Sequence, residues 1–230
     1  MKNALITGGS RGLGLALARR LAQKGWGLII DARDEKDLEL VRSELSAKTN
    51  FIAIPGDVTV RSHRKKLAEA ASEVGGLDAL INNASFLGPS PQPELMAYPV
   101  KMLEQVYRTN VIAPLALIQT LRHFLRPEAC IINVTSDAGI AAYKGWGGYG
   151  SSKAALEHLS HILAEENPSL RIYWVDPGDM RTQMQQEAFP GEDISDRPLP
   201  EESVPGLLAL IEGTKPSGRY QAREWAKTNE

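Results

Sequence analysis

Tyr149 and Lys153 lie four residues apart in a segment with helical periodicity, and this spacing puts both side chains on one helical face. An isolated phenol titrates near pH ~10, and a neighbouring ammonium group favours the phenolate and so lowers the pKa of the phenol. Such a pair can give a proton to an oxygen atom that gains negative charge during reduction of a carbonyl. Because the chain has six tyrosines, a chance Tyr-x-x-x-Lys is common, and the interpretation depends on the surrounding elements.

Those elements alternate along the chain. Short apolar runs typical of buried strands are separated by segments with helical periodicity. This alternation predicts an α/β fold, a doubly wound parallel sheet of about seven strands with helices on both faces. The expected strands cover residues 3–7, 27–30, 51–55, 77–82, 129–135, 170–175 and 219–222, and the expected helices cover 13–24, 35–46, 61–74, 101–125, 149–166 and 200–212.

Length and composition indicate one domain over residues 1–230. Pro114 is expected to kink the helix over 101–125, and residues 183–200, rich in Pro, Glu, Asp and Gly, are expected to form a mobile substrate loop. The net charge of −2 gives no reason to expect nucleic acid or an anionic membrane as a partner. The apolar runs are too short to span a membrane, and a strand-like run from Asn3 leaves no room for a signal peptide, so we expect a cytoplasmic protein.

Two further residue types are given structural interpretations. Cys130, the single cysteine, lies in an apolar run and is expected to be a buried, inert thiol. His158 and His161 lie three residues apart on the expected tyrosine helix, but no third ligand is evident nearby, so we expect no metal site.

A glycine-rich loop, Thr7-Gly8-Gly9-Ser10-Arg11-Gly12-Leu13-Gly14, joins the first expected strand to the first expected helix. Glycines at such a junction allow a tight turn and let a pyrophosphate approach backbone N–H groups at the helix N-terminus. The loop therefore predicts a dinucleotide site. Its expected contacts are Gly8, Ser10, Arg11, Gly12, Leu13 and Gly14.

The end of the second strand, Asp31-Ala32-Arg33, bears on the choice of dinucleotide. An acidic residue there would bind the ribose hydroxyls of NAD, whereas an arginine would pair with the 2′-phosphate of NADP. Ala32 fills the position that usually carries the acid, Arg33 follows it, and Arg11 is a second cation on the same side. We therefore favour NADP. NAD stays possible if Asp31 turns inward to the ribose.

The chain resembles the single-domain branch of the short-chain dehydrogenase/reductase (SDR) family over nearly its whole length. Several motifs carry the resemblance, each placed where a strand or helix should put it, and their combination in this order is highly specific. They are the Thr-Gly-x-x-x-Gly-x-Gly loop at 7–14, Asp57-Val58, Asn82-Asn83-Ala84-Ser85, Asn110, Ser136, Tyr149-Gly-Ser-Ser-Lys153, Pro177-Gly178 and Thr182.

The resemblance implies a single-domain Rossmann fold and a set of catalytic roles. Tyr149 is the implied general acid/base, and Ser136 donates a hydrogen bond to the substrate oxygen, as charge development on that oxygen requires. Lys153 holds the nicotinamide ribose and lowers the pKa of Tyr149, and Asn110 supports a water molecule that links Lys153 to solvent. Ser136 as a turn cap, or Asn110 as a residue at a helix kink, is the structural alternative.

The resemblance also implies the remaining cofactor contacts. Asp57 and Val58 lie near the adenine ring, and Asn83 and Ala84 pass beneath the ribose and nicotinamide. Pro177, Gly178 and Thr182 border the nicotinamide. Ser85 departs from the family pattern, which usually has glycine there, and it adds a hydroxyl near the nicotinamide or the substrate.

The favoured function is an NADP-dependent oxidoreductase, a carbonyl reductase acting on a small apolar aldehyde or ketone or on its alcohol. An NAD-dependent sugar or sterol-type alcohol dehydrogenase and a non-catalytic NADP-binding redox sensor are the alternatives. The expected substrate lining is mostly apolar or aromatic: Ser85, Phe86, Leu87, Ile140, Tyr143, Trp146, Met180, Met184 and Phe189, with Lys144 and Arg181 nearby. Excess apolar residues on the tyrosine helix and the family's habit of pairing predict a homodimer or homotetramer.

Overall fold

Seven parallel strands form one sheet in the computed structural model, which describes residues 1–227 of the chain. The strand order is β3-β2-β1-β4-β5-β6-β7, and each neighbouring pair is parallel, which confirms the predicted doubly wound sheet. The strands are β1 (Asn3–Ile6), β2 (Gly27–Ala32), β3 (Phe51–Pro55), β4 (Leu77–Asn82), β5 (Leu125–Val134), β6 (Arg171–Asp176) and β7 (Gly218–Gln221).

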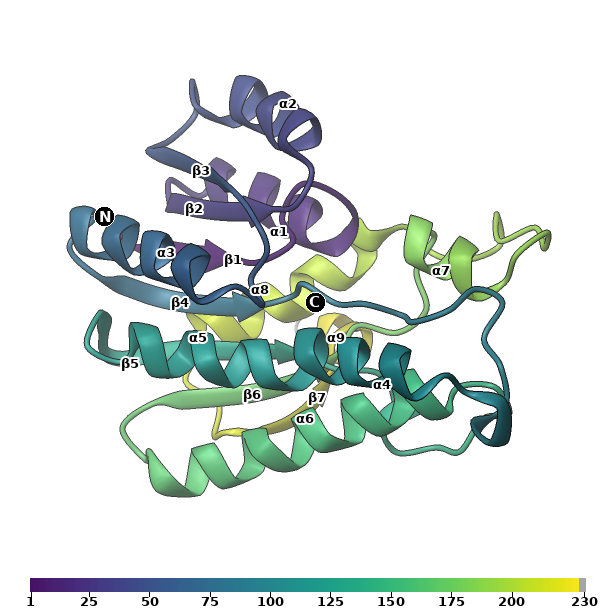
Figure 1. Ribbon diagram of the computed structural model, residues 1–230. Helices are drawn as coiled ribbons and strands as arrows, with labels where there is room; N and C mark the ends of the chain where they lie inside the picture. The colour runs from purple at the N-terminus through teal and green to yellow at the C-terminus, as the bar shows by residue number, and fades with distance from the viewer. Residues whose placement is uncertain (228–230) are drawn as a thin grey trace.

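Helices cover both faces of the sheet (Figure 1). The helices α1 (Gly12–Gln23), α2 (Glu35–Leu45) and α8 (Val204–Glu212) pack on one face, and α3 (Arg61–Glu73), α5 (Ala113–Leu121) and α6 (Gly147–Glu166) pack on the other. The strands β1 and β4 are neighbours although β2 and β3 lie between them in the chain, so the strand order reverses there. Open α/β sheets bind ligands beyond the carboxyl ends of the strands at such a reversal.

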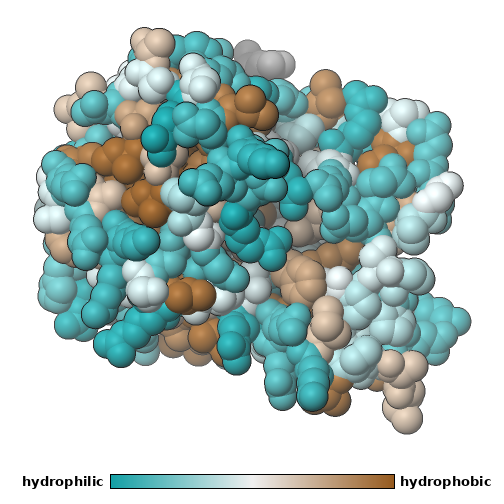
Figure 2. Space-filling model, turned by 45° about the horizontal axis from the view of Figure 1, so that its top comes forward, coloured by the Kyte–Doolittle hydropathy of each residue, from teal (hydrophilic) through white to brown (hydrophobic). Residues whose placement is uncertain are grey.

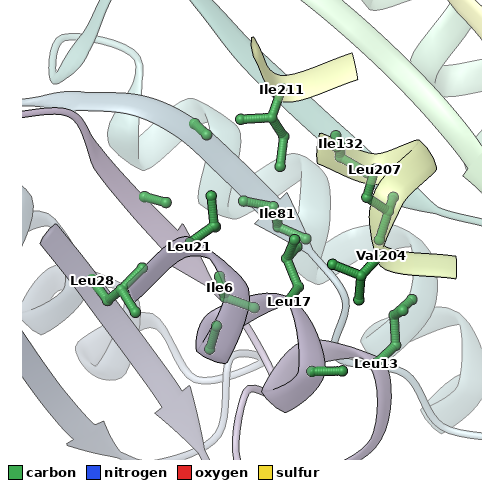
Figure 3. Packing of buried hydrophobic residues seen from close by; sticks show 14 of the residues in the cluster. Ile6, Leu13, Leu17, Leu21, Leu28, Ile81, Ile132, Val204, Leu207 and Ile211 are labelled. Atoms are coloured by element: carbon green, nitrogen blue, oxygen red, sulfur yellow. The ribbon is translucent and has the colours of Figure 1, made fainter. Parts of the chain in front are cut away.

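The core between α1, α8 and the sheet holds the glycine loop in place. Leu13, Leu17 and Leu21 recur every four residues on α1 and therefore point to one side of the helix (Figure 3). Their partners in the sheet and on α8 are Ile6, Ile81, Ile132, Val204, Leu207 and Ile211. All of these side chains are buried, and each contributes about 1.5–3 kcal/mol by leaving water. The start of α1 is thereby fixed against the end of β1.

The helix expected over 101–125 is interrupted and ends early. The chain forms α4 (Val100–Tyr107), a π-helical turn over Arg108–Ile112 and then α5, whereas Leu125 is the first residue of β5. Pro114 lies in the first turn of α5, where its missing N–H costs little. The irregularity expected at Pro114 therefore takes the form of a π-helical turn just before it, which widens the helix around Asn110.

Three other segments differ from expectation. The expected loop over 183–200 begins with a short helix, α7 (Gln183–Ala188), capped by Thr182, whose Oγ1 accepts a hydrogen bond from the Gln185 N–H at 3.2 Å. The helix expected over 200–212 starts with a 3₁₀ turn at Pro200–Ser203 and becomes α-helical only in α8. A further helix, α9 (Ala222–Lys227), follows β7 and was not expected.

The face of the molecule in Figure 2 is mainly hydrophilic, with hydrophobic residues in small, separate patches. Among the helices of residues 1–227, none combines the length and apolar character that crossing a membrane requires.

Candidate active site

One cavity of about 1740 Å³ lies at the carboxyl edge of the sheet and is lined by nearly all the predicted site residues. It reaches from the glycine loop and the end of β2, past β4 and β5, to the segment after β6. Of the predicted catalytic and cofactor residues, Gly14 and Asn110 do not line it; both lie behind its wall. Of the predicted substrate residues, Ile140 is absent from the lining and its side chain is 65% exposed, so that expectation was wrong.

Tyr149 and Lys153 face each other in the first two turns of α6. The Lys153 Nζ lies 5.3 Å from the centre of the Tyr149 ring and donates a hydrogen bond to the Val134 carbonyl at 2.8 Å. The Tyr149 ring also packs edge-on against Trp146, with 5.8 Å between ring centres. Both residues of the pair are buried, so the phenol and the ammonium group are held in a fixed relation at the cavity wall.

Burial opposes the pKa change expected for the phenol. Removal of Tyr149 from water raises its pKa well above the ordinary value of a phenol, and the negative charges of Asp176 and Asp137 add to this effect. Burial also lowers the pKa of Lys153 to about 7, while Glu157 acts in the opposite sense. The expected lowering of the Tyr149 pKa is therefore not seen, and the phenol is protonated at neutral pH.

Ser136 has the capping role that the sequence offered as the structural alternative, and its hydroxyl lies at the cavity. Its Oγ accepts a hydrogen bond from the Ala138 N–H at 3.2 Å and so caps a short 3₁₀ turn. The same hydroxyl donates to Asp137 Oδ1 at 2.9 Å, and Ser136 lines the cavity with Tyr149. Asp137 also accepts a hydrogen bond from the Tyr143 hydroxyl at 2.9 Å. Sequence reasoning missed Asp137, although it directly follows Ser136.

Asn110 stabilises the cavity wall from behind. Its side chain is fully buried in the π-helical turn, where Oδ1 accepts from the Phe86 N–H at 2.8 Å and from Ser85 Oγ at 3.1 Å. Its Nδ2 donates to the Phe86 carbonyl at 2.9 Å and to Ser152 Oγ at 3.0 Å. The Asn110 side chain therefore joins the segment after β4 to α6, which makes it a positioning residue in this structure.

The glycine loop is closely packed where a pyrophosphate would approach. Gly8 has φ +63°, and a Cβ atom on it would lie 3.0 Å from the Ala84 Cα. A Cβ on Gly14 would lie 2.6 Å from the Gly8 carbonyl oxygen. The N-terminus of α1 has no side-chain cap and no acidic residue in its first turn. Its N–H groups and the helix dipole are therefore available to an anion.

Asn83 and Ala84 join this loop to the end of β4. Asn83 Nδ2 donates to the carbonyls of Thr7 and Gly8 at 2.9 and 3.0 Å. Thr7 Oγ1 accepts from the backbone N–H groups of Asn83 and Ala84, each at 3.0 Å. Because these bonds fix two neighbouring strand ends together, the predicted pyrophosphate loop and the predicted nicotinamide segment share one wall of the cavity.

Asp31 and Arg33 have separate environments at the end of β2. The Asp31 side chain is buried, and its two oxygens are hydrogen-bonded to the Gly8 N–H and to His63 Nε2, both at 2.9 Å. Burial raises the pKa of Asp31, an effect that the bonds to His63 and Gly8 oppose. Arg33 is exposed and lines the cavity. Asp31 thus braces the glycine loop, and Arg33 is the exposed cation that lines the cavity at this position.

The residues predicted around the nicotinamide lie in the segment after β6 and line the same cavity. Asp176, the last residue of β6, accepts a hydrogen bond from the Gly178 N–H at 2.8 Å, and Gly178 has φ +73°. The Pro177 carbonyl accepts from Ser203 Oγ at 2.7 Å. Thr182 lies beside Gly12, since a Cβ on that glycine would be 3.5 Å from the Thr182 methyl group. Asp57 and Val58 line the opposite end of the cavity.

Polar contacts that sequence spacing could not reveal hold α6 and the strand ends in place. Glu157, one turn after Lys153, accepts from Thr135 Oγ1 at 2.8 Å and forms an ion pair with Arg219 at 3.1 Å. Deeper in the sheet, Asn133 Nδ2 donates to Ser160 Oγ at 2.8 Å. These bonds tie β5 and β7 to α6.

The helix α7 is tied to both sides of the cavity. Arg11 in the glycine loop donates a hydrogen bond to the Gln183 side chain, and Ser90 Oγ donates to the Glu187 carbonyl at 2.6 Å. Several α7 residues line the cavity. This helix therefore covers the space between the glycine loop and the segment that follows β4.

The fold and the cavity define a dinucleotide-binding α/β protein with a tyrosine–lysine pair at its ligand edge. Residues 2–193 match the family model of the short chain dehydrogenases. The chain therefore belongs to the short-chain dehydrogenase/reductase family of oxidoreductases.

Individual relatives agree with this assignment. A rhamnolipid-biosynthesis 3-oxoacyl-[acyl-carrier-protein] reductase of Pseudomonas aeruginosa is 37% identical over 191 residues, which cover 79% of this chain and 73% of the relative. A benzil reductase of Saccharomyces cerevisiae is 33% identical over 196 residues, covering 81% of this chain and 74% of the relative. A short-chain dehydrogenase structure from Escherichia coli CFT073, complexed with NADPH, superposes with a TM-score of 0.86 at 26% identity and 96% coverage of both chains.

Proposed function

We propose that the protein is an NADP(H)-dependent reductase of a small, mainly apolar aldehyde or ketone, with Tyr149 as the general acid. The observation that carries this proposal is that Tyr149, Lys153 and Ser136 line the same cavity as the glycine loop. The reverse reaction, oxidation of the alcohol, uses the same groups with Tyr149 as the base.

The protonation state of Tyr149 supports a role as proton donor. Reduction builds negative charge on the carbonyl oxygen, and a protonated phenol at the cavity wall can transfer its proton there. Ser136 can donate a second hydrogen bond to that oxygen when its hydroxyl turns from Asp137 toward the cavity. Lys153 lies behind the phenol and, when protonated, stabilises the phenolate that the transfer leaves.

The residues around the cavity fit an NADP molecule. The uncapped start of α1 offers N–H donors to the pyrophosphate, and the missing side chains of Gly8 and Gly14 let the loop pack closely against Ala84 and Asn83. Arg33, with Arg11 nearby, would pair with the 2′-phosphate, because Asp31 is buried and bonded to Gly8 and His63. When bound, the cofactor supplies the hydride that carbonyl reduction requires. The relative of known structure that holds NADPH supports the same choice.

The other end of the cavity supports an apolar substrate. Its lining includes Phe86, Leu87, Trp146, Met184 and Phe189. The charged residues of the lining are of both signs, with Lys144 and Arg181 beside Asp137 and Glu187, so the apolar side chains carry the argument for substrate class. The two relatives named above are reductases of carbonyl compounds, one of them of benzil, an aromatic diketone.

The proposal is tested with purified full-length protein, NADPH or NADH, and a panel of substrates. The panel should contain aromatic and aliphatic aldehydes and ketones, sugars, and keto acids. We expect NADPH oxidation with neutral apolar carbonyls, measured as the loss of the absorbance of the reduced nicotinamide. Turnover confined to sugars with NAD would favour a sugar dehydrogenase instead, and tight NADPH binding without turnover of any substrate would favour a redox sensor.

Gly8→Ala should lose cofactor affinity. An alanine at φ +63° costs about 1–2 kcal/mol, and its Cβ would also push the Ala84 backbone away from the loop. We expect NADPH affinity to fall roughly tenfold or more in a fluorescence titration, together with a lower melting temperature. Gly25→Ala is the matched control, since Gly25 has φ +77° with no atom within 4 Å of a Cβ and lies at the far end of α1. The control should lose stability but keep its NADPH affinity. Equal affinities in both variants would contradict a role of the Gly8 backbone in cofactor binding.

We also propose that the protein is a cytoplasmic homo-oligomer. Ile162 on α6 is 41% exposed although it lies on a helix whose neighbouring leucines pack inward, and a second subunit would cover it.

A further inference from the structure

His63 is a buried histidine that the proposed reaction does not use. It lies on α3, and its side chain is only 5% exposed. The other three histidines of the chain, His123, His158 and His161, are exposed. Because buried polar side chains are nearly always hydrogen-bonded, the partner of His63 indicates what the residue does.

The His63 ring is fixed between β2 and the residue that follows β3. Its Nε2 lies 2.9 Å from Asp31 Oδ2. An ionised carboxylate only accepts hydrogen bonds, so the Nε2–H is the donor. The ring also lies against the Gly56 backbone, since a Cβ atom on Gly56 would be 2.2 Å from His63 Nδ1. The imidazole therefore has little room to turn away from Asp31, and the two side chains form a buried pair.

Asp31 is the group whose contacts this pair controls. Asp31 lines the cavity near the end of β2, where an acidic side chain can bind the ribose hydroxyls of NAD. Its Oδ1 accepts from the Gly8 N–H at 2.9 Å, and its Oδ2 is the oxygen bonded to His63. While His63 is in place, both oxygens are engaged inside the protein. Loss of the imidazole would release one of them at the cavity wall.

We propose that His63 is a specificity-determining residue that keeps the cofactor site selective for NADP(H) by holding Asp31 away from the adenosine ribose. The imidazole acts through Asp31 and does not itself line the cavity. An Asp31 oxygen released from His63 would accept a hydrogen bond from the 2′-hydroxyl of NAD. The ionised 2′-phosphate of NADP has no such donor, and the released oxygen would repel it. This inference rests on the proposed binding of NADP(H) at this end of the cavity and on no catalytic role of Tyr149.

The primary test compares His63→Asn with His63→Gln. A glutamine amide can reach the position of the imidazole Nε2 and donate to Asp31, whereas an asparagine amide reaches only the position of Nδ1. We expect His63→Asn to weaken NADPH binding and strengthen NADH binding, so that the ratio of the two dissociation constants moves about tenfold toward NADH. His63→Gln should keep the wild-type ratio. Fluorescence titration of both cofactors measures these constants without turnover.

The ratio separates this role from a purely structural one, because a loss of stability alone would weaken both cofactors equally. Leu67→Ala is the matched control on the same helix, since Leu67 is fully buried in the apolar core and lies one turn after His63. It should lower the melting temperature and leave the ratio unchanged. A wild-type ratio in His63→Asn would overturn the proposal.

A double-mutant cycle tests whether His63 acts through Asp31. Asp31→Ala removes the carboxylate that would bind the ribose of NAD. In that background His63→Asn should therefore produce no further change in the ratio. A full shift toward NADH in the absence of the Asp31 carboxylate would contradict the proposed role of the pair.

A measurement on the wild-type protein covers the case in which His63→Asn does not fold. ¹⁵N NMR of the imidazole rings reports the proton on each Nε2, and the His63 signal is the one lost in His63→Gln. This signal should persist when NADPH is bound, and its loss on NADPH binding would overturn the proposal. Absence of carbonyl reduction by the wild type would refute the proposed reaction alone, whereas an unchanged ratio in an active His63→Asn would refute only the role of His63.

Discussion

Replacing Tyr149 with phenylalanine should reduce kcat about 100- to 10,000-fold while leaving NADPH affinity near the wild-type value. The substitution removes only the hydroxyl. The ring keeps its edge-on contact with Trp146 and its place beside the Lys153 ammonium group, so the cavity wall should stay intact. Steady-state reduction of a neutral carbonyl gives kcat, and fluorescence titration gives the NADPH dissociation constant.

Tyr143→Phe is the matched control for this experiment. Tyr143 lines the same cavity, but its hydroxyl donates to Asp137 and its ring is 47% exposed. Loss of that hydroxyl should change kcat far less than loss of the Tyr149 hydroxyl. A comparable loss in both variants would mean that turnover depends on hydroxyl groups in the cavity in general. Normal turnover in Tyr149→Phe would refute the role of Tyr149 as general acid.

The pKa of Tyr149 also predicts how rate depends on pH. Burial raises this pKa above the ordinary value of a phenol, so the phenol stays protonated from neutral into alkaline pH. The phenol itself therefore limits reduction only as pH rises through its own pKa, whereas the stabilising charge of Lys153 is lost earlier, as pH rises through about 7, and reduction should slow there first. Alcohol oxidation, which starts from the phenolate, should increase in the same direction.

The fold could be predicted because its strands are apolar along their length. Strands covered on both faces, such as β1 and β4, leave mainly hydrophobic runs in the sequence. Glycines follow the ends of α1 and α3, at Gly25 and Gly75. The interruption between α4 and α5 could not be predicted in this way. The apolar pattern continues through it, and the π-helical turn holds Asn110, whose partners lie in the distant segment after β4.

The helix α7 had a sequence signal that the composition of its segment hid. Proline, acidic residues and glycine over 183–200 favoured a loop, but Thr182 followed by Gln183–Ala188 is a threonine cap before good helix-forming residues. A shorter window would have identified this helix. It matters for the site because α7 contacts both the glycine loop and Ser90.

Most of the candidate site follows from short motifs at strand ends, since parallel strands bring their carboxyl ends to one edge. What the motifs cannot give is the environment of each charge. His63 lies 32 residues from Asp31 in the chain, yet its Nε2 is hydrogen-bonded to one of the two Asp31 carboxylate oxygens. The direction of the Tyr149 pKa likewise depends on burial by residues scattered along the chain. Such effects are properties of the folded packing, so residue type and spacing do not reveal them.

The environment of Asp31 decides what Arg33 is expected to do. Because both Asp31 oxygens are bonded inside the protein, a ribose hydroxyl could replace those bonds only by leaving Gly8 or His63 unpaired. Within residues 1–227 the Arg33 guanidinium forms no ion pair or hydrogen bond that a ligand would have to replace, and Arg33 lines the cavity. A phosphate on the adenosine ribose would give it a charge-assisted partner that NAD lacks.

Arg33→Ala should therefore weaken NADP binding by about 1.5–3 kcal/mol, roughly 10- to 150-fold in dissociation constant, and leave NAD binding almost unchanged. Titrations of both cofactors against both proteins measure the difference. Arg20→Ala is the control for net charge, since Arg20 is also exposed but bonds Gln23 on the far part of α1. It should affect neither cofactor. The 2′-phosphate is the only chemical difference between the two cofactors. Equal weakening of both by Arg33→Ala would therefore mean that Arg33 has a structural role, and Arg11 would become the candidate for the phosphate contact.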